Sequence, residues 1–115
     1  MTFQTADELR QGTCKPCEGG VEKMTLSEAR QQVELLAGWE LDEEGHSIHK
    51  VWERKDFRDA MGFLNRIADI AEADQHHPDL HLVGYKTVRV ALMTHAIGGL
   101  SENDFILAAK IDETA

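Results

Sequence analysis

Apolar residues recur at helical spacing most clearly in the stretch DFRDAMGFLNRIADIAEA, residues 56–73. This spacing predicts a long amphipathic helix that turns one face toward a core. That face comprises Phe57, Ala60, Met61, Leu64, Ile67, Ala68 and Ala71. A residue that precedes proline is disfavoured in helical conformation, so Pro78 indicates that the helix ends near Gln75. The adjacent His76 and His77 are therefore expected in a constrained turn at the helix exit.

Two further helices are indicated by residues that can satisfy backbone N–H groups at a helix start. Thr25 and Glu28 fit a capping box, and Gly38 is expected to end the helix that follows. The apolar stripe of this helix consists of Leu26, Ala29, Val33 and Leu36. Ser101 and Asp104 cap a last helix in the same way, which includes Phe105, Ile106, Ala109 and Lys110.

The segments between these helices have the pattern of strands. WELDEEGHSIHKVWER, residues 39–54, is expected to form a hairpin with its turn around Glu44 and Gly45. A short extended piece, Leu80 to Leu82, leads to Gly84 and to the alternating stretch YKTVRVALMTH, residues 85–95. One side of this strand carries Val88, Val90, Leu92 and Thr94, and the other carries Thr87, Arg89, Ala91, Met93 and His95. The order of elements predicts an α+β fold, with helices on one face of an antiparallel sheet.

Length and composition favour a single soluble domain. The 115 residues fit one domain. Residues 1–23 are polar and contain glycine, which predicts a flexible N-terminal arm, and residues 24–115 are expected to form the domain. No apolar run approaches the ~20 residues that a membrane span needs. The first residues lack the cationic start and apolar stretch of a secretory signal, so a cytoplasmic location is expected.

The charge balance argues against binding to nucleic acid. There are 12 basic and 21 acidic residues, which give a formal net charge of -9. Such a chain repels phosphate backbones and anionic membrane surfaces. Lys and Arg also form no cluster that would favour either partner.

The only cysteines, Cys14 and Cys17, lie in the stretch TCKPCEGG. A structural zinc site needs four ligands, and no second cysteine pair exists. A thioredoxin-like pair should open a helix after a strand, whereas Pro16 and the following glycines predict a loop. A reduced pair in a turn is favoured, and zinc completed by histidines elsewhere stays open.

Four of the six histidines fall in DQHHPDLHLVGYKTVRVALMTH, residues 74–95. His77 and His81 have the spacing of metal ligands on a helix, with Asp74 and His95 as further candidates, but Pro78 rules out a regular helix between them. Surface or packing roles are the alternative for any single histidine. Converging imidazoles with a carboxylate can instead exchange protons near neutral pH. No serine or cysteine nearby in sequence suggests a nucleophile, so the pattern favours acid–base chemistry such as dehydration.

The stretches GWEL, EADQHHPDLHL and THAIGGLSEND together resemble the pterin-4a-carbinolamine dehydratase family, over residues 25–115. The resemblance implies a four-stranded antiparallel sheet with helices packed on one face, assembled into homodimers or tetramers. It also implies removal of water from a 4a-hydroxytetrahydropterin, which gives the quinonoid dihydropterin. The pterin would be the substrate, and neither a metal nor a further cofactor is expected.

By the same resemblance, the catalytic residues are His76, His77, His95 and Asp104. His76 and His95 would exchange protons with the 4a-hydroxyl and a ring nitrogen, and Asp104 would orient His95. The pterin would be held by His77, Pro78 and Thr94.

Two features depart from the commoner dehydratase pattern. The segment between Pro78 and Tyr85 has one residue more, which Gly84 is expected to accommodate as a bulge. CKPCEGG precedes the first capping box. Both resemble a branch that assists Rubisco assembly beside alpha-carboxysomes, so the alternative is a non-catalytic chaperone whose partner is the Rubisco large subunit. The intact histidines and Asp104 favour the enzyme.

Overall fold

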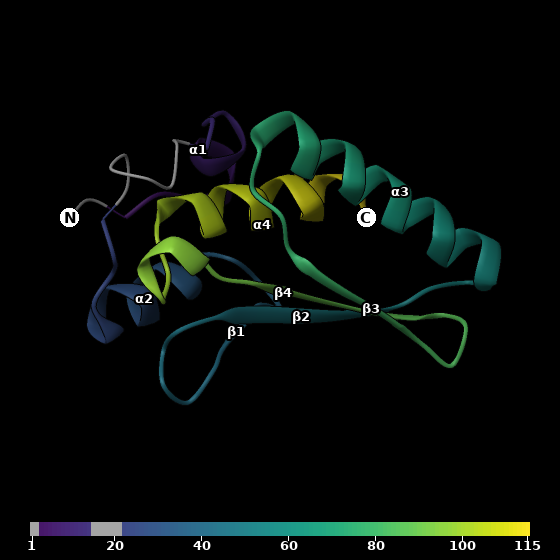
Figure 1. Cartoon of the computed structure of the whole chain (residues 1–115), viewed down its shortest axis with the longest axis horizontal. Helices are drawn as coiled ribbons and strands as arrows, with labels where there is room; N and C mark the ends of the chain where they lie inside the picture. Colours follow the sequence, from purple (N-terminus) through teal and green to yellow (C-terminus); the bar gives the residue numbers. More distant parts are fainter. Residues whose placement is uncertain (1–2, 15–21) are drawn as a thin grey trace.

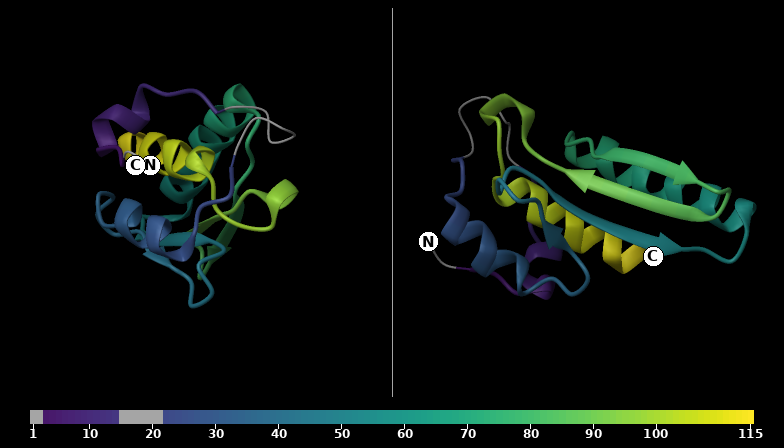
Figure 2. Two further views of the ribbon diagram at one scale, coloured as in Figure 1. Left: turned by 90° about the vertical axis from the view of Figure 1, so that its left-hand side faces the viewer. Right: turned by 90° about the horizontal axis from the view of Figure 1, so that it is seen from below.

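The computed structural model describes residues 3–14 and 22–115, which form a four-stranded antiparallel sheet with helices on one face, as predicted. Along the chain the elements are α1 (Ala6–Arg10), α2 (Leu26–Val33), β1 (Glu40–Leu41), β2 (Ile48–Glu53), α3 (Phe57–Asp74), β3 (Asp79–Val83), β4 (Thr87–Leu92), the 3-10 turn η1 (His95–Ile97) and α4 (Glu102–Thr114). The strands lie in the order β1-β2-β4-β3. Figures 1 and 2 show α3 and α4 on the same side of this sheet.

The core lies between the sheet and helices α3 and α4. On β4, Val88, Val90 and Leu92 are buried and alternate with less buried residues, as the sequence predicted. Helix α4 contributes an unbroken run of buried residues from Asn103 to Ala109, so it is the central helix of the fold. Within residues 3–14 and 22–115, no helix combines the length and apolar character needed to cross a membrane.

The core face of helix α3 matches the predicted one in part, because Ala60, Ile67 and Ala71 are buried as expected but Phe63 was missed. Its buried residues are Ala60, Phe63, Ile67 and Ala71. Phe57 and Met61, which were expected in the core, are 54% and 39% exposed. The helix ends as expected, at Asp74, because Gln75 takes a left-handed conformation with φ 53°.

The hairpin of β3 and β4 shows how the additional residue is accommodated. The two strands pair one to one from Asp79 with Ala91 to Val83 with Thr87, so the predicted bulge is wrong. Gly84 lies instead in the turn that joins the strands, with φ 57°. The predicted strand through His95 is also too long, because β4 ends at Leu92 and His95 begins η1.

The described part of the predicted N-terminal arm contains a short helix. Thr5 and Glu8 form a capping box at the start of α1, and the side chain of Leu9 is fully buried. Helix α1 lies against α4. The burial of the Leu9 side chain therefore stabilises a helix in a segment whose polar composition predicted no ordered structure. The domain boundary near residue 23 stays a prediction.

Replacing Gly45 by alanine is expected to lower the free energy of unfolding by ~1–3 kcal/mol, because Gly45 has φ 74° and an added Cβ would collide with the Leu26 side chain. Urea unfolding monitored by circular dichroism measures the loss. Gly84→Ala is the matched control, since its φ is also positive but nothing lies within 4 Å of the added Cβ. Equal losses in the two variants would contradict the predicted contribution of the Leu26 contact.

Candidate active site

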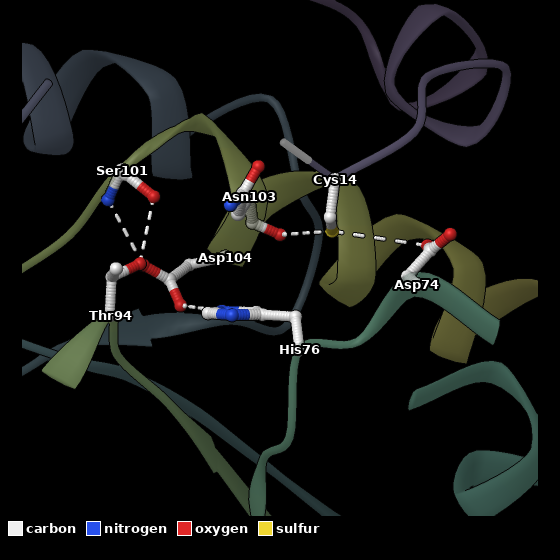
Figure 3. Close-up of polar contacts among 7 residues, drawn as sticks. All are labelled: Cys14, Asp74, His76, Thr94, Ser101, Asn103 and Asp104. Carbon is white, nitrogen blue, oxygen red and sulfur yellow. Dashed lines mark hydrogen bonds and ion pairs between the residues drawn. The ribbon is translucent and has the colours of Figure 1, made fainter. Parts of the chain in front are cut away.

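A buried histidine–carboxylate pair joins the end of α3 to the start of α4. The His76 Nε2 atom lies 2.7 Å from Asp104 Oδ1. Both side chains are withdrawn from solvent, with exposed fractions of 5% for His76 and 0% for Asp104. The left-handed Gln75 turns the chain at the end of α3, and Asp104 is the third residue of α4. Figure 3 shows the His76 ring directed at the Asp104 carboxylate.

The second oxygen of Asp104 is also held. Asp104 Oδ2 accepts hydrogen bonds from Thr94 Oγ1 at 2.8 Å and from the Ser101 backbone N–H at 3.0 Å. The Thr94 and Ser101 hydroxyls lie 2.7 Å apart. All three residues are fully buried. The carboxylate that begins helix α4 is thus the same group that contacts His76 (Figure 3).

This arrangement fixes both the position and the tautomer of His76. An ionised carboxylate only accepts hydrogen bonds, so His76 Nε2 carries the proton that lies toward Asp104 Oδ1. A histidine oriented in this way can give or take a proton at its other ring nitrogen, and the carboxylate stabilises the imidazolium that forms. The pair can therefore act in general acid–base catalysis.

The structure changes the roles expected of Asp104 and Thr94. Asp104 was expected to orient His95, whereas its carboxylate contacts His76, Thr94 and Ser101. Thr94 was expected to hold the substrate, but its side chain is fully buried and its hydroxyl donates to Asp104. Thr94 continues the buried side of β4, on which the alternation had already placed it, so its side chain faces the interior.

The other two predicted histidines lie at the surface. The side chain of His77 is 59% exposed, and its Nε2 lies 2.6 Å from Glu72 Oε2. His95 is exposed at the first position of η1, directly after the buried Thr94. Pro78 is half-buried and leads into β3. The structure therefore joins His76, Thr94 and Asp104 in one network and places His77 and His95 next to it in the chain.

Sequence reasoning identified Ser101 only as a helix cap and did not connect it with the histidines. The capping box was the available signal that Ser101 contacts Asp104, because in such a box the acidic side chain of the third helical residue accepts a hydrogen bond from the backbone N–H of the cap residue. Glu72 was also missed as the partner of His77. Within the described residues, no group of three or more His, Cys, Asp or Glu side chains is arranged to hold a metal ion.

The first cysteine of the Cys-x-x-Cys pair lies close to this site. Cys14 Sγ is 3.6 Å from the Asn103 carbonyl oxygen and 3.9 Å from Asp74 Oδ2. Asn103 directly precedes Asp104 in the chain, and Asp74 lies two residues before His76; Figure 3 shows Cys14 between Asn103 and Asp74. Cys17 lies outside the described residues, so the proposed turn and the zinc alternative stay predictions.

Comparisons with known proteins agree with the resemblance in the sequence. The family model described as pterin 4 alpha carbinolamine dehydratase matches residues 22–114. The mitochondrial pterin-4-alpha-carbinolamine dehydratase 2 of Arabidopsis thaliana is 46% identical over 115 residues, with 97% of this chain aligned. The chain spans 62% of the length of that relative. A putative pterin-4-alpha-carbinolamine dehydratase of Halorhodospira halophila is 45% identical, and the alignment covers 90% of this chain and 94% of the relative.

A solved structure supports the same fold. The crystal structure of a transcriptional coactivator/pterin dehydratase from Brucella melitensis matches with a TM-score of 0.76 and 33% sequence identity. The match covers 82% of this chain and 99% of the other chain.

Proposed function

The chain belongs to the pterin-4a-carbinolamine dehydratase family, and we propose that it eliminates water from a 4a-hydroxytetrahydropterin to give the quinonoid dihydropterin. The observation that carries this proposal is the buried His76–Asp104 pair at the helix exit, with His95 immediately after Thr94 of the same network. His95 adds a second imidazole to the oriented one of His76, and a dehydration needs two proton-transfer groups.

The reaction requires two proton transfers and no redox step. One group donates a proton to the 4a-hydroxyl, whose carbon–oxygen bond breaks and releases water. A second group accepts a proton from a ring nitrogen, and the electron pair left on that nitrogen forms the new double bond. After one turnover the acid has lost a proton and the base has gained one. Exchange of a proton between the two groups through solvent restores both starting states.

We assign these transfers to His76 and His95. Asp104 holds the His76 imidazole and balances its positive charge when the ring is protonated. His95 is exposed, so its imidazole can reach a substrate bound at the surface beside η1. His77 is exposed as well and would contact the pterin from the start of the β3 segment.

The position of the additional residue supports the catalytic interpretation. Gly84 and Tyr85 lie in the turn at one end of the β3–β4 hairpin, whereas His77 and Pro78 precede β3 at its other end. The unbroken pairing of β3 with β4 separates the two ends. The longer turn therefore need not move the histidines. This matters because a catalytic group misplaced by about 1 Å can lose ~100-fold in rate.

His95→Ala is expected to lower the dehydration rate by ~100-fold or more while leaving thermal stability nearly unchanged, because His95 is exposed. The measurement is the decay of a freshly generated 4a-hydroxytetrahydropterin, followed by absorbance with and without purified protein. His81→Ala is the control, since His81 is also exposed but lies on β3. Wild-type protein that does not accelerate the decay beyond buffer would overturn the proposal.

Assembly of Rubisco remains the alternative function, with the large subunit as partner. The position of Cys14 next to the site is the observation that favours it, since dehydration does not require a thiol there. Under this alternative, coexpression would raise the yield of assembled Rubisco, and His95→Ala would keep that benefit. An unchanged yield would count against it. A homo-oligomeric state, a cytoplasmic location and a carboxysome association stay predictions.

A further inference from the structure

A second, partly buried ion pair connects the same two helices as His76 and Asp104. Asp74 is the last residue of α3, and Lys110 lies on α4. The Lys110 Nζ atom is 2.6 Å from Asp74 Oδ2. The exposed fractions of the two side chains are 8% for Asp74 and 22% for Lys110. Removing either partner would leave the other charge largely shielded from water, which is costly.

The surroundings of this pair link it to the catalytic network. Cys14 Sγ approaches the Asp74 carboxylate from the side of Asn103, the residue before Asp104. Figure 3 shows Cys14 between the end of α3 and the start of α4. Only Gln75 separates Asp74 from His76, and its left-handed backbone leaves that link little freedom. A displacement of Asp74 would therefore be passed directly to the His76 ring.

We propose that Asp74, held by Lys110 and contacted by Cys14, is a positioning residue that keeps the His76 imidazole on Asp104. The inference rests on the proposed dehydration and assigns neither Asp74 nor Lys110 a contact with the substrate. The ion pair fixes the last turn of α3 against α4, and the fixed turn holds His76 Nε2 within hydrogen-bond reach of Asp104 Oδ1. Cys14, whose thiol is not needed as a reacting group in dehydration, thus acquires a structural role beside the site.

Lys110→Met tests the inference, because methionine keeps much of the side-chain length and removes the charge. We expect kcat to fall about tenfold with KM changed by less than about twofold, since the groups that contact substrate remain but one is less well placed. Lys110→Arg should restore most of the loss. Asp74→Asn, which keeps the shape of the side chain, provides the same test if Lys110→Met folds poorly.

A second readout does not depend on activity. The proton between His76 Nε2 and Asp104 Oδ1 should give a slowly exchanging, far-downfield imidazole signal in the NMR spectrum, assigned by its loss in Asp104→Asn. Lys110→Met should broaden this signal or speed its exchange at a temperature where the variant is folded. If the proposed dehydration fails, wild-type protein will lack activity while this NMR comparison still tests the positioning.

Lys50→Met is the matched control. Lys50 also forms an ion pair with α4, at 2.8 Å from Asp112 Oδ1, and the exposed fractions of the two side chains are 20% and 23%. This pair ties β2 to the far end of α4, away from Asp104. Lys50→Met should lower the melting temperature but leave kcat and the imidazole signal unchanged. Equal loss of stability in both variants, with neither kcat nor the signal altered by Lys110→Met, would overturn the inference.

Discussion

Asp104→Asn is expected to lower the dehydration rate by ~100-fold or more and the free energy of unfolding by about 1–3 kcal/mol. The carboxylate is fully buried and accepts from Thr94 and Ser101 on one oxygen while His76 lies against the other. An amide has only one accepting oxygen. If that oxygen stays with Thr94 and Ser101, the amide N–H group faces His76 Nε2 and forces the ring into the opposite tautomer.

The measurements are the steady-state dehydration rate and urea unfolding of the same preparation. Glu102→Gln is the matched control, because Glu102 is in the first turn of the same helix and its carboxylate accepts from Gln4 rather than from a histidine. It should retain the wild-type rate. An Asp104→Asn variant that keeps full activity would show that the orientation of His76 is irrelevant to the chemistry.

Phe63→Ala is expected to lower the free energy of unfolding by about 3–5 kcal/mol, the cost of a large cavity in a well-packed core. The Phe63 ring is fully buried and packs edge-to-face against Trp52, with ring centroids 5.0 Å apart. The Arg54 guanidinium lies 4.5 Å from the same ring. Removing the ring therefore takes one packing contact from each of these two neighbours.

Chemical denaturation of Phe63→Ala and Phe57→Ala measures how much of the loss in the free energy of unfolding comes from the burial of the ring, because both variants replace phenylalanine by alanine. Phe57 is on the same helix but 54% exposed, so its replacement should change stability by no more than about 0.5 kcal/mol. Similar losses in the two variants would show that the exposed face of α3 is covered in solution.

The same pair of phenylalanines explains what could be predicted of the fold. The helix over residues 57–74, its end before Pro78 and the alternation on β4 were all visible as local patterns. The buried face of α3 was predicted only in part: Ala60, Ile67 and Ala71 are buried as expected, whereas the buried Phe63 was missed and Phe57 is exposed. Which of the apolar residues at the edges of this face are buried depends on where the sheet lies, and that is tertiary information.

The candidate site was also predicted only in part. The family resemblance supplied His76 and Asp104, and the capping box placed Asp104 at a helix start. The partner of the carboxylate was misassigned, because the carboxylate contacts Thr94, the residue before His95, and sequence separation does not tell which histidine it contacts. The alternation had placed Thr94 on the side of the buried Val88, Val90 and Leu92, so its assignment to substrate binding, which came from the resemblance, conflicted with the strand pattern.

Asp104 serves the folding of α4 and the orientation of His76 with one carboxylate. Selection for a stable domain would preserve that aspartate even in a descendant that had stopped processing pterins. Its presence in a relative is therefore weak evidence of turnover. An exposed imidazole such as His95 contributes little to stability, so its loss in a lineage would be the more informative genetic marker of abandoned catalysis.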